Sequence, residues 1–158
     1  MKTKPLTFLL ALTFLFLFSG SSVVFADDFQ DAQDSYNRKD YKTARKLWTQ
    51  LAEKGDGKAQ TNLGWIYEKG KGVTQDNQKA AKWYRLAAEQ GFTHAQTNLG
   101  MMYYSGNGVL RDDKEAVKWH RLAAEQGNAL AIFRLGVMLD ILTAIGNITK
   151  CFSKKMLG

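Results

Sequence analysis

The chain has 158 residues, of which 45% are hydrophobic and 23% are charged, a balance that excludes a disordered acidic tail. A single cysteine excludes an internal disulfide framework and a multi-cysteine zinc site, and one proline among 14 glycines favours helices separated by glycine turns. The formal net charge of +7 is a mild basic excess that does not by itself indicate nucleic acid as a partner.

The first 26 residues have the pattern of a cleavable secretory signal. Lys2 and Lys4 form a positive start, residues 6–18 are an apolar run rich in Leu and Phe, and small and polar residues lead to Ala26. The apolar run is short for a membrane span of about 20 residues, and an uncleaved membrane anchor stays open as the alternative. We expect cleavage after Ala26 and a periplasmic or secreted mature chain, which touches the membrane only if this segment is uncleaved. Removing the segment lowers the net charge to +5, and export argues against nucleic acid as a partner.

The middle of the chain is a tandem repeat with a period of 36 residues. Residues 58–93 and 94–129 align without gaps and are identical at 21 positions. A period between about 20 and 50 residues is typical of stacked-repeat proteins. The predicted fold class is therefore an all-α solenoid of antiparallel helix pairs.

Each unit contains two helical patterns separated by a glycine turn. Leu63 and Tyr67 lie on one face of the first helix, and Gly64 and Gly100 are expected where the two helices of a pair come closest. Asp112 is expected to cap the second helix in a capping box with Glu115. Asp76 is the equivalent cap one unit earlier, Gly91 is expected to end the second helix, and the expected buried stripe comprises Ala80, Trp83, Ala87 and Ala88, with Trp119 equivalent to Trp83.

Two incomplete units flank the repeat. Residues 27–57 are a shortened first unit with helices over 28–39 and 41–55, and residues 130–158 are a partial fourth unit with a divergent tail. In this tail the apolar residues recur at helical spacing: Met138, Ile141, Leu142, Ile145, Ile148 and Phe152.

We expect residues 131 to about 152 to form one or two helices, with Gly146 as the break. The apolar stripe would pack near Val117, Leu122 and Ala124 as a cap. The alternative is an exposed stripe that makes a homo-oligomer with another chain, near Cys151.

The motif A-x-x-x-L-G-x-x-Y-x-x-G-x-G-V, then D-x-x-x-A-x-x-W, then A-A-E-Q-G, resembles the Sel1-like repeat, a relative of the tetratricopeptide repeat. The resemblance covers residues 58–129 fully, 28–57 in shortened form and 130–138 in part. It implies a right-handed superhelix and a role as a scaffold or adaptor. Because each repeat touches only its neighbours, such a stack leaves an extended concave face open to a partner.

Candidate chemistry is sparse in this sequence. His94 and His120 lie on different helices without a metal-binding spacing, so we expect no metal or cofactor and assign both to polar helix surface. No serine-hydrolase motif is present. Cysteine-rich relatives are described as weak β-lactamases or penicillin binders, but their paired cysteines are missing here. We expect no enzyme activity, and a hydrolase of β-lactam or cell-wall substrates is kept as an alternative, beside a truncated, non-functional repeat protein.

The expected function is the binding of a protein or peptide partner along the concave face. Asn62 and Asn98 recur in the first helix, at a place comparable to that where the asparagines of tetratricopeptide relatives bind a peptide backbone or a terminal carboxylate. The alternative is a hydrogen bond within the repeat or a solvated polar position. Trp65 and Met101 share one register and suit an apolar anchor, although Trp65 is equally consistent with packing between repeats. The complete set of predicted partner-binding residues is Thr61, Asn62, Trp65, Lys69, Thr97, Asn98, Met101 and Arg134.

Overall fold

The computed structural model describes the backbone of residues 28–156 and the side chains of residues 28–141 and of Thr143. Seven helices and no strand occur in this part, which confirms the predicted all-α fold. The helices are residues 28–37, α2 (Tyr41–Glu53), α3 (Gly57–Lys69), α4 (Asn77–Glu89), α5 (Thr93–Ser105), α6 (Asp113–Glu125) and α7 (Ala129–Met156). The expected signal segment and its cleavage after Ala26 lie outside the described residues.

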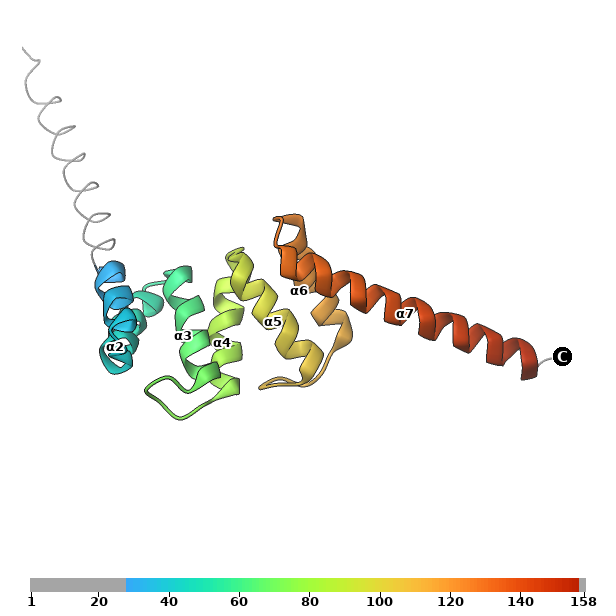
Figure 1. The fold of residues 1–158 in the computed structure, drawn as a ribbon, viewed down its shortest axis with the longest axis horizontal. Helices are drawn as coiled ribbons and strands as arrows, with labels where there is room; N and C mark the ends of the chain where they lie inside the picture. The colour runs from blue at the N-terminus through green and yellow to red at the C-terminus, as the bar shows by residue number, and fades with distance from the viewer. Residues whose placement is uncertain (1–27, 157–158) are drawn as a thin grey trace, which may run out of the picture.

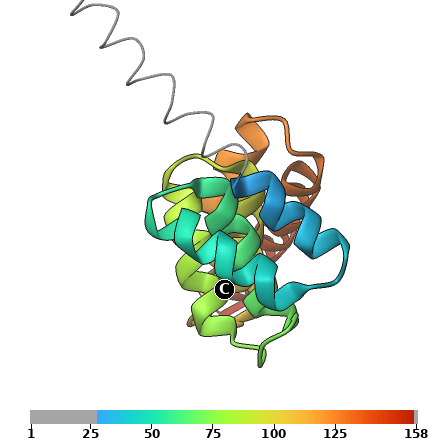
Figure 2. The same cartoon turned by 90° about the vertical axis from the view of Figure 1, so that its left-hand side faces the viewer.

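The helices stack in chain order, as the succession of colours in Figure 1 shows. From α2 to α7 each helix packs on the one before and the one after it, and α3 also meets α5. Figure 2 looks along this stack from its first helices, which lie in front of the later ones. The helix over 28–37 and α2 form the first unit, α3 and α4 the second, α5 and α6 the third, and α7 begins a fourth. Since contacts run between neighbours, the stability of each unit depends on the next.

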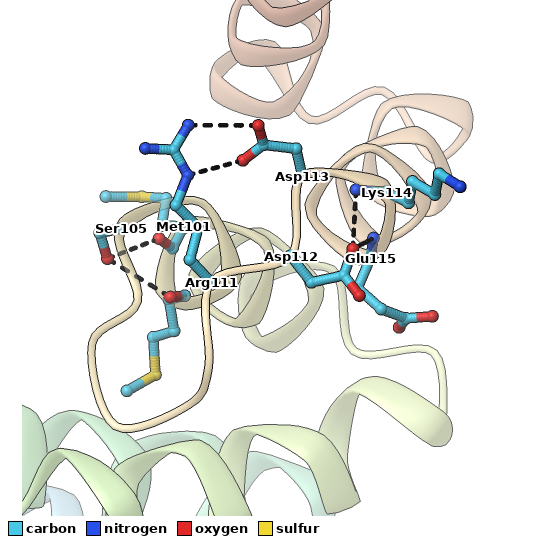
Figure 3. Close-up of polar contacts among 8 residues, drawn as sticks. Met101, Ser105, Arg111, Asp112, Asp113, Lys114 and Glu115 are labelled. Carbon is cyan, nitrogen blue, oxygen red and sulfur yellow. Dashed lines mark hydrogen bonds and ion pairs between the residues drawn. The ribbon is translucent and has the colours of Figure 1, made fainter.

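Aspartates begin the second helices as predicted. The Asp76 carboxylate accepts a hydrogen bond from the backbone N–H of Lys79 at 2.9 Å, and that of Asp112 accepts from Lys114 and Glu115 at 2.9 and 3.1 Å (Figure 3). The expected capping box is only half formed, because the backbone N–H of Asp112 donates to the carbonyl of Tyr103 instead. Glu115 is thereby free to accept a hydrogen bond from the Trp119 indole, at 3.0 Å.

The glycine loops join one unit to the previous one. Gly108, at φ +73°, lies so close to the start of α4 that a Cβ added to it would be 2.1 Å from the carbonyl oxygen of Asn77. Gly72 approaches Tyr41 in the same way one unit earlier, with a Cβ 2.7 Å from the Tyr41 Cβ. The loop after each first helix therefore rests on the second helix of the preceding unit, which only a glycine permits at this distance.

The core follows the predicted stripe with one exchange. Ala80, Ala87 and Ala88 are buried, and so is Trp119, but Trp83 is only partly buried and Tyr84 is fully buried in its place. The expectation that Trp83 is a core residue is therefore wrong. The physical reason is that Gly64 has no side chain, which lets the Tyr84 ring enter the space between α3 and α4.

Helix α7 corrects the predicted cap. It is one continuous helix, without a break at Gly146, and its red end in Figure 1 extends away from the other helices. Ala131 and Met138 are buried against the third unit, whereas Leu139, Ile141 and Leu122 are exposed. Of the two described stripe side chains, Met138 packs as predicted and Ile141 does not, while the remaining stripe side chains, with Cys151, lie outside the described ones. None of the described helices is long and apolar enough to cross a membrane.

Candidate functional site

The first helices of successive units share a cavity of about 500 Å³, called here the α5 cavity. Helix α5 supplies more of its wall than any other helix, the end of α3 closes one side, and the first turns of α7 close the other, with single residues from α4 and α6. It brings together four predicted site residues from three units: Lys69, Asn98, Met101 and Arg134. Such concave sites, with apolar walls and a few placed polar groups, are where ligands bind in most proteins.

One end of the α5 cavity is a closed hydrogen-bond network. The Glu68 carboxylate accepts from the Tyr84 hydroxyl at 2.8 Å and pairs with the Lys69 ammonium at 2.5 Å. The Asn98 side chain lies beside the Tyr84 hydroxyl, where it favours a lower pKa of that group. Burial, and then the Glu68 charge, raises the pKa of Tyr84, so the phenol stays protonated and donates. Because Tyr84 and Asn98 belong to successive repeats, this contact is not the hydrogen bond within one repeat that was an alternative for the asparagines, and their role in binding stays a prediction.

The other end of the α5 cavity has unpaired polar atoms. His120 is 1% exposed, and its Nδ1 atom is buried without a hydrogen-bond partner in the described residues. The Nε atom of Arg134 is likewise buried without a hydrogen-bond partner in the described residues. Burial lowers the pKa of His120, and the Arg134 charge lowers it further, so the imidazole is held in its neutral form. The assignment of His120 to polar helix surface is therefore wrong: Gly100 leaves room for its ring between α5 and α6, as Gly64 does for Tyr84.

The wall between these ends is apolar and rich in methionine. Met101 is 36% exposed, Val137 is exposed to a similar degree, and Met102 and Met138 are buried behind them. Methionine side chains are flexible and adapt to ligands of different shape. Ser105, which follows on α5, is held by bonds from its hydroxyl to the carbonyls of Met101 and Met102, so the rim beside the glycine loop is ordered (Figure 3).

A second cavity, of about 580 Å³, lies at the start of α3 and is called here the α3 cavity. Thr61 and Asn62 line it, together with Phe29, Phe92 and the exposed His94. The Thr61 hydroxyl donates to the carbonyl of Gly57 at 2.7 Å, one turn back in the same helix. Two predicted site residues therefore lie apart from the four in the α5 cavity.

The Sel1 repeat family matches three segments of the chain, residues 38–56, 57–92 and 93–128, which together make more than half of it. The chain belongs to the Sel1 repeat family. Comparison with the curated proteins finds no match.

Solved structures show the same repeat architecture. A Sel1 repeat protein from Oxalobacter formigenes is 38% identical with a TM-score of 0.67, over 70% of this chain and 45% of that one. A protective antigen of uropathogenic Escherichia coli strains, which displays an SLR fold, is 36% identical with a TM-score of 0.70, over 75% of this chain and 26% of that one. The chain therefore spans less than half the length of either relative. Cysteine rich protein B of Helicobacter pylori, at 24% identity and a TM-score of 0.59 over 71% of this chain and 95% of that one, shares the fold.

Two predicted residues serve the stacking of the Sel1 repeats. Trp65 is partly buried, packs against the cores of two repeats and meets the Tyr36 ring edge-on at 5.5 Å between centroids. Thr97 is 3% exposed and donates its hydroxyl to the carbonyl of Thr93. Trp65 thus fits its alternative role in packing between repeats, and the expectation that Thr97 faces a partner is wrong because its side chain is buried.

Glutamines form a hydrogen-bond ladder along the Sel1 repeats that the sequence patterns did not predict, with Gln60 and Gln96 buried and Gln90 and Gln126 at the surface. Gln60 and Gln96 donate to the carbonyls of Ala52 and Ala88 in the preceding helices, at 3.1 and 3.2 Å. Gln90 in turn donates to Gln60 at 2.8 Å, and Gln126 repeats this bond on Gln96. The recurrence of these glutamines at the 36-residue period is the sequence feature that indicates a shared structural role. Within the described residues there is no cluster of three His, Cys, Asp or Glu side chains able to hold a metal.

Proposed function

We propose that this protein is an exported scaffold that binds a protein or peptide partner across the α5 cavity. The observation that carries the proposal is that this one cavity is formed by the first helices of three successive units and contains Lys69, Asn98, Met101 and Arg134 together. A site shared by several repeats is the arrangement by which solenoid proteins bind extended partners. Sel1 repeat proteins are commonly protein-interaction scaffolds, which agrees with this proposal.

The export part of the proposal is supported by the signal pattern of residues 1–26. The hydrolase alternative gains no support from the family match, and the described residues that line the α5 cavity include no cysteine and no serine with a hydrogen-bonded histidine base.

Photo-crosslinking tests the proposal with a matched control. A photoreactive residue replaces Met101 on the cavity wall, or Leu86 on α4, which is 45% exposed and lines none of the described cavities. We expect a discrete crosslinked partner from position 101 and none from position 86, as judged by gel shift and mass spectrometry. Equal crosslinking at both positions, or none at position 101, contradicts the proposal, and the latter agrees with a non-functional repeat protein.

A further inference from the structure

Three positions differ between the earlier contact of two units and the equivalent contact one unit later, which lies at the α5 cavity. Each such contact between units is called a junction here. Between α3, α4 and α5, the Tyr84 hydroxyl donates a hydrogen bond to Glu68, and the Asn98 side chain lies beside it. One period of 36 residues later these three positions are His120, Tyr104 and Arg134. The carboxylate of the earlier junction has thus become a phenol, while the neutral amide has become a guanidinium.

The exchange leaves buried polar atoms unpaired. The guanidinium of Arg134 has donors only, and its Nε atom lacks a hydrogen-bond partner in the described part of the chain, as does Nδ1 of His120. A buried donor without a partner costs about 1–3 kcal/mol, so such atoms in a native protein require an explanation. Both residues line the α5 cavity, and Arg134 is only partly buried, so a bound group meets its guanidinium there while the His120 ring lies behind it.

The charges around the cavity define the missing group. Glu68 is the only carboxylate among the described lining residues, and it is already engaged by Tyr84 and Lys69. Arg134 makes no ion pair with a described residue, so its charge has no counterpart in this part of the chain. An anion beside Arg134 and His120 replaces the carboxylate that the earlier junction contains, and the adjoining Met101 and Val137 offer an apolar surface.

We propose that the α5 cavity binds a peptide carboxylate that is next to an apolar side chain, with Arg134 pairing with the carboxylate beside His120. This inference deepens the proposed function and rests on it. The carboxylate comes from the chain terminus of the partner or from an acidic side chain, and both share the chemistry that the guanidinium recognises.

Nuclear magnetic resonance of the two histidine rings tests the inference. The protein is titrated with three probes: acetyl-Leu-Leu with a free carboxylate, acetyl-Leu-Leu-amide, and acetyl-Glu-Leu-amide. We expect saturable shifts of the His120 ring signals with a carboxylate probe and none with acetyl-Leu-Leu-amide, while the exposed His94 ring, in the α3 cavity, stays unchanged. The first and third probes distinguish a terminal from a side-chain carboxylate.

The variant Arg134→Asn restores the residue type of the earlier units and so is compatible with the fold. We expect it to weaken carboxylate binding roughly 10- to 100-fold, as for a lost charged hydrogen bond. Arg121→Asn, at an exposed site on α6, is the control and keeps the wild-type affinity.

Equal shifts with the amide, no saturable shift of His120, or unchanged affinity in Arg134→Asn overturns the inference. If these occur while Met101 still crosslinks to a partner, the carboxylate site is wrong and the scaffold function stands. If crosslinking fails as well, both are wrong.

Discussion

The aromatic ring of Tyr84 occupies the space that a side chain on Gly64 would need. A Cβ added to Gly64 would be 2.5 Å from Cδ1 of Tyr84, and the hydroxyl at the far end of the same ring is fixed by Glu68 at 2.8 Å. The ring is fully buried and held at both ends, so it has little room to move. At this pair α3 and α4 therefore pack without room for a side chain on Gly64.

Substitution of the helix glycines measures this close packing. Gly64→Ala should lower the free energy of unfolding by about 1 kcal/mol or more, because overpacking by about 1–3 kcal/mol exceeds the gain in helix propensity. Gly100→Ala should be milder, since its nearest atom on His120 is 2.9 Å away. Gly136→Ala, with nothing within 4 Å, is the control and should raise stability by about 1 kcal/mol. Urea unfolding of the three variants ranks their free energies of unfolding. Equal changes in stability at all three sites would contradict close packing at Gly64 and Gly100.

The glycine loops provide a second test, of contact between units. Gly106 and Gly108 have the same left-handed backbone, at φ +74° and +73°, so alanine strains both by about 1–2 kcal/mol. At Gly106 the nearest atom is 3.5 Å from the added Cβ, but at Gly108 the carbonyl of Asn77 is 2.1 Å away. Gly108→Ala should therefore destabilise the protein clearly more than Gly106→Ala in thermal or urea unfolding. Similar losses in both variants would show that the loop does not rest on α4.

His120 should make the fold sensitive to mild acid. Its pKa is lowered in the folded state by burial and by the charge of Arg134, so below about pH 6.5 the unfolded chain binds the proton more readily than the folded one. The free energy of unfolding should therefore fall as the pH drops from 6.5 through the lowered pKa, and should be unaffected by this group above that window. His120→Tyr, which copies the residue at position 84, should lose less stability between pH 7.5 and pH 5 in urea unfolding. His94→Tyr, at an exposed site, is the matched control and should follow the wild type.

The point at which α7 leaves the stack can be located by two substitutions. Met138 is buried in the core of the third unit, so Met138→Ala should cost about 2–5 kcal/mol. Ile141 is 43% exposed only three residues later, and Ile141→Ala should change stability by no more than about 0.5 kcal/mol. Thermal melts separate the two. A large loss of stability in Ile141→Ala would instead support the predicted packed cap. If light scattering also gives this variant a smaller mass than the wild type, the loss would indicate an oligomer.

The export prediction concerns the chain terminus. The signal pattern ending at Ala26 predicts that the exported protein begins at Asp27. N-terminal sequencing of the protein recovered outside the cytoplasm should return Asp-Asp-Phe. A start at Met1 would support the uncleaved anchor, and a start beyond Gln30 would contradict the cleavage site.

The sequence by itself determined the repeat architecture, the helix caps and the glycine turns. These depend on periodicity and local chemistry, as in the carboxylate of Asp76 that meets a backbone N–H three residues away. The same period of 36 residues predicted where α3 to α6 lie and where Gly64 and Gly100 pack.

Only the tertiary structure decided which side chains are buried and which share a cavity. Helical spacing leaves the rotation of a helix uncertain by about one residue, which exchanged Trp83 for Tyr84 in the core and placed His120 inside instead of on the surface. Lys69 and Arg134 line one cavity because three units stack on one another. Ile141 is exposed because no described helix beyond α7 covers it. Both depend on how whole helices stack on one another, which local sequence patterns do not determine.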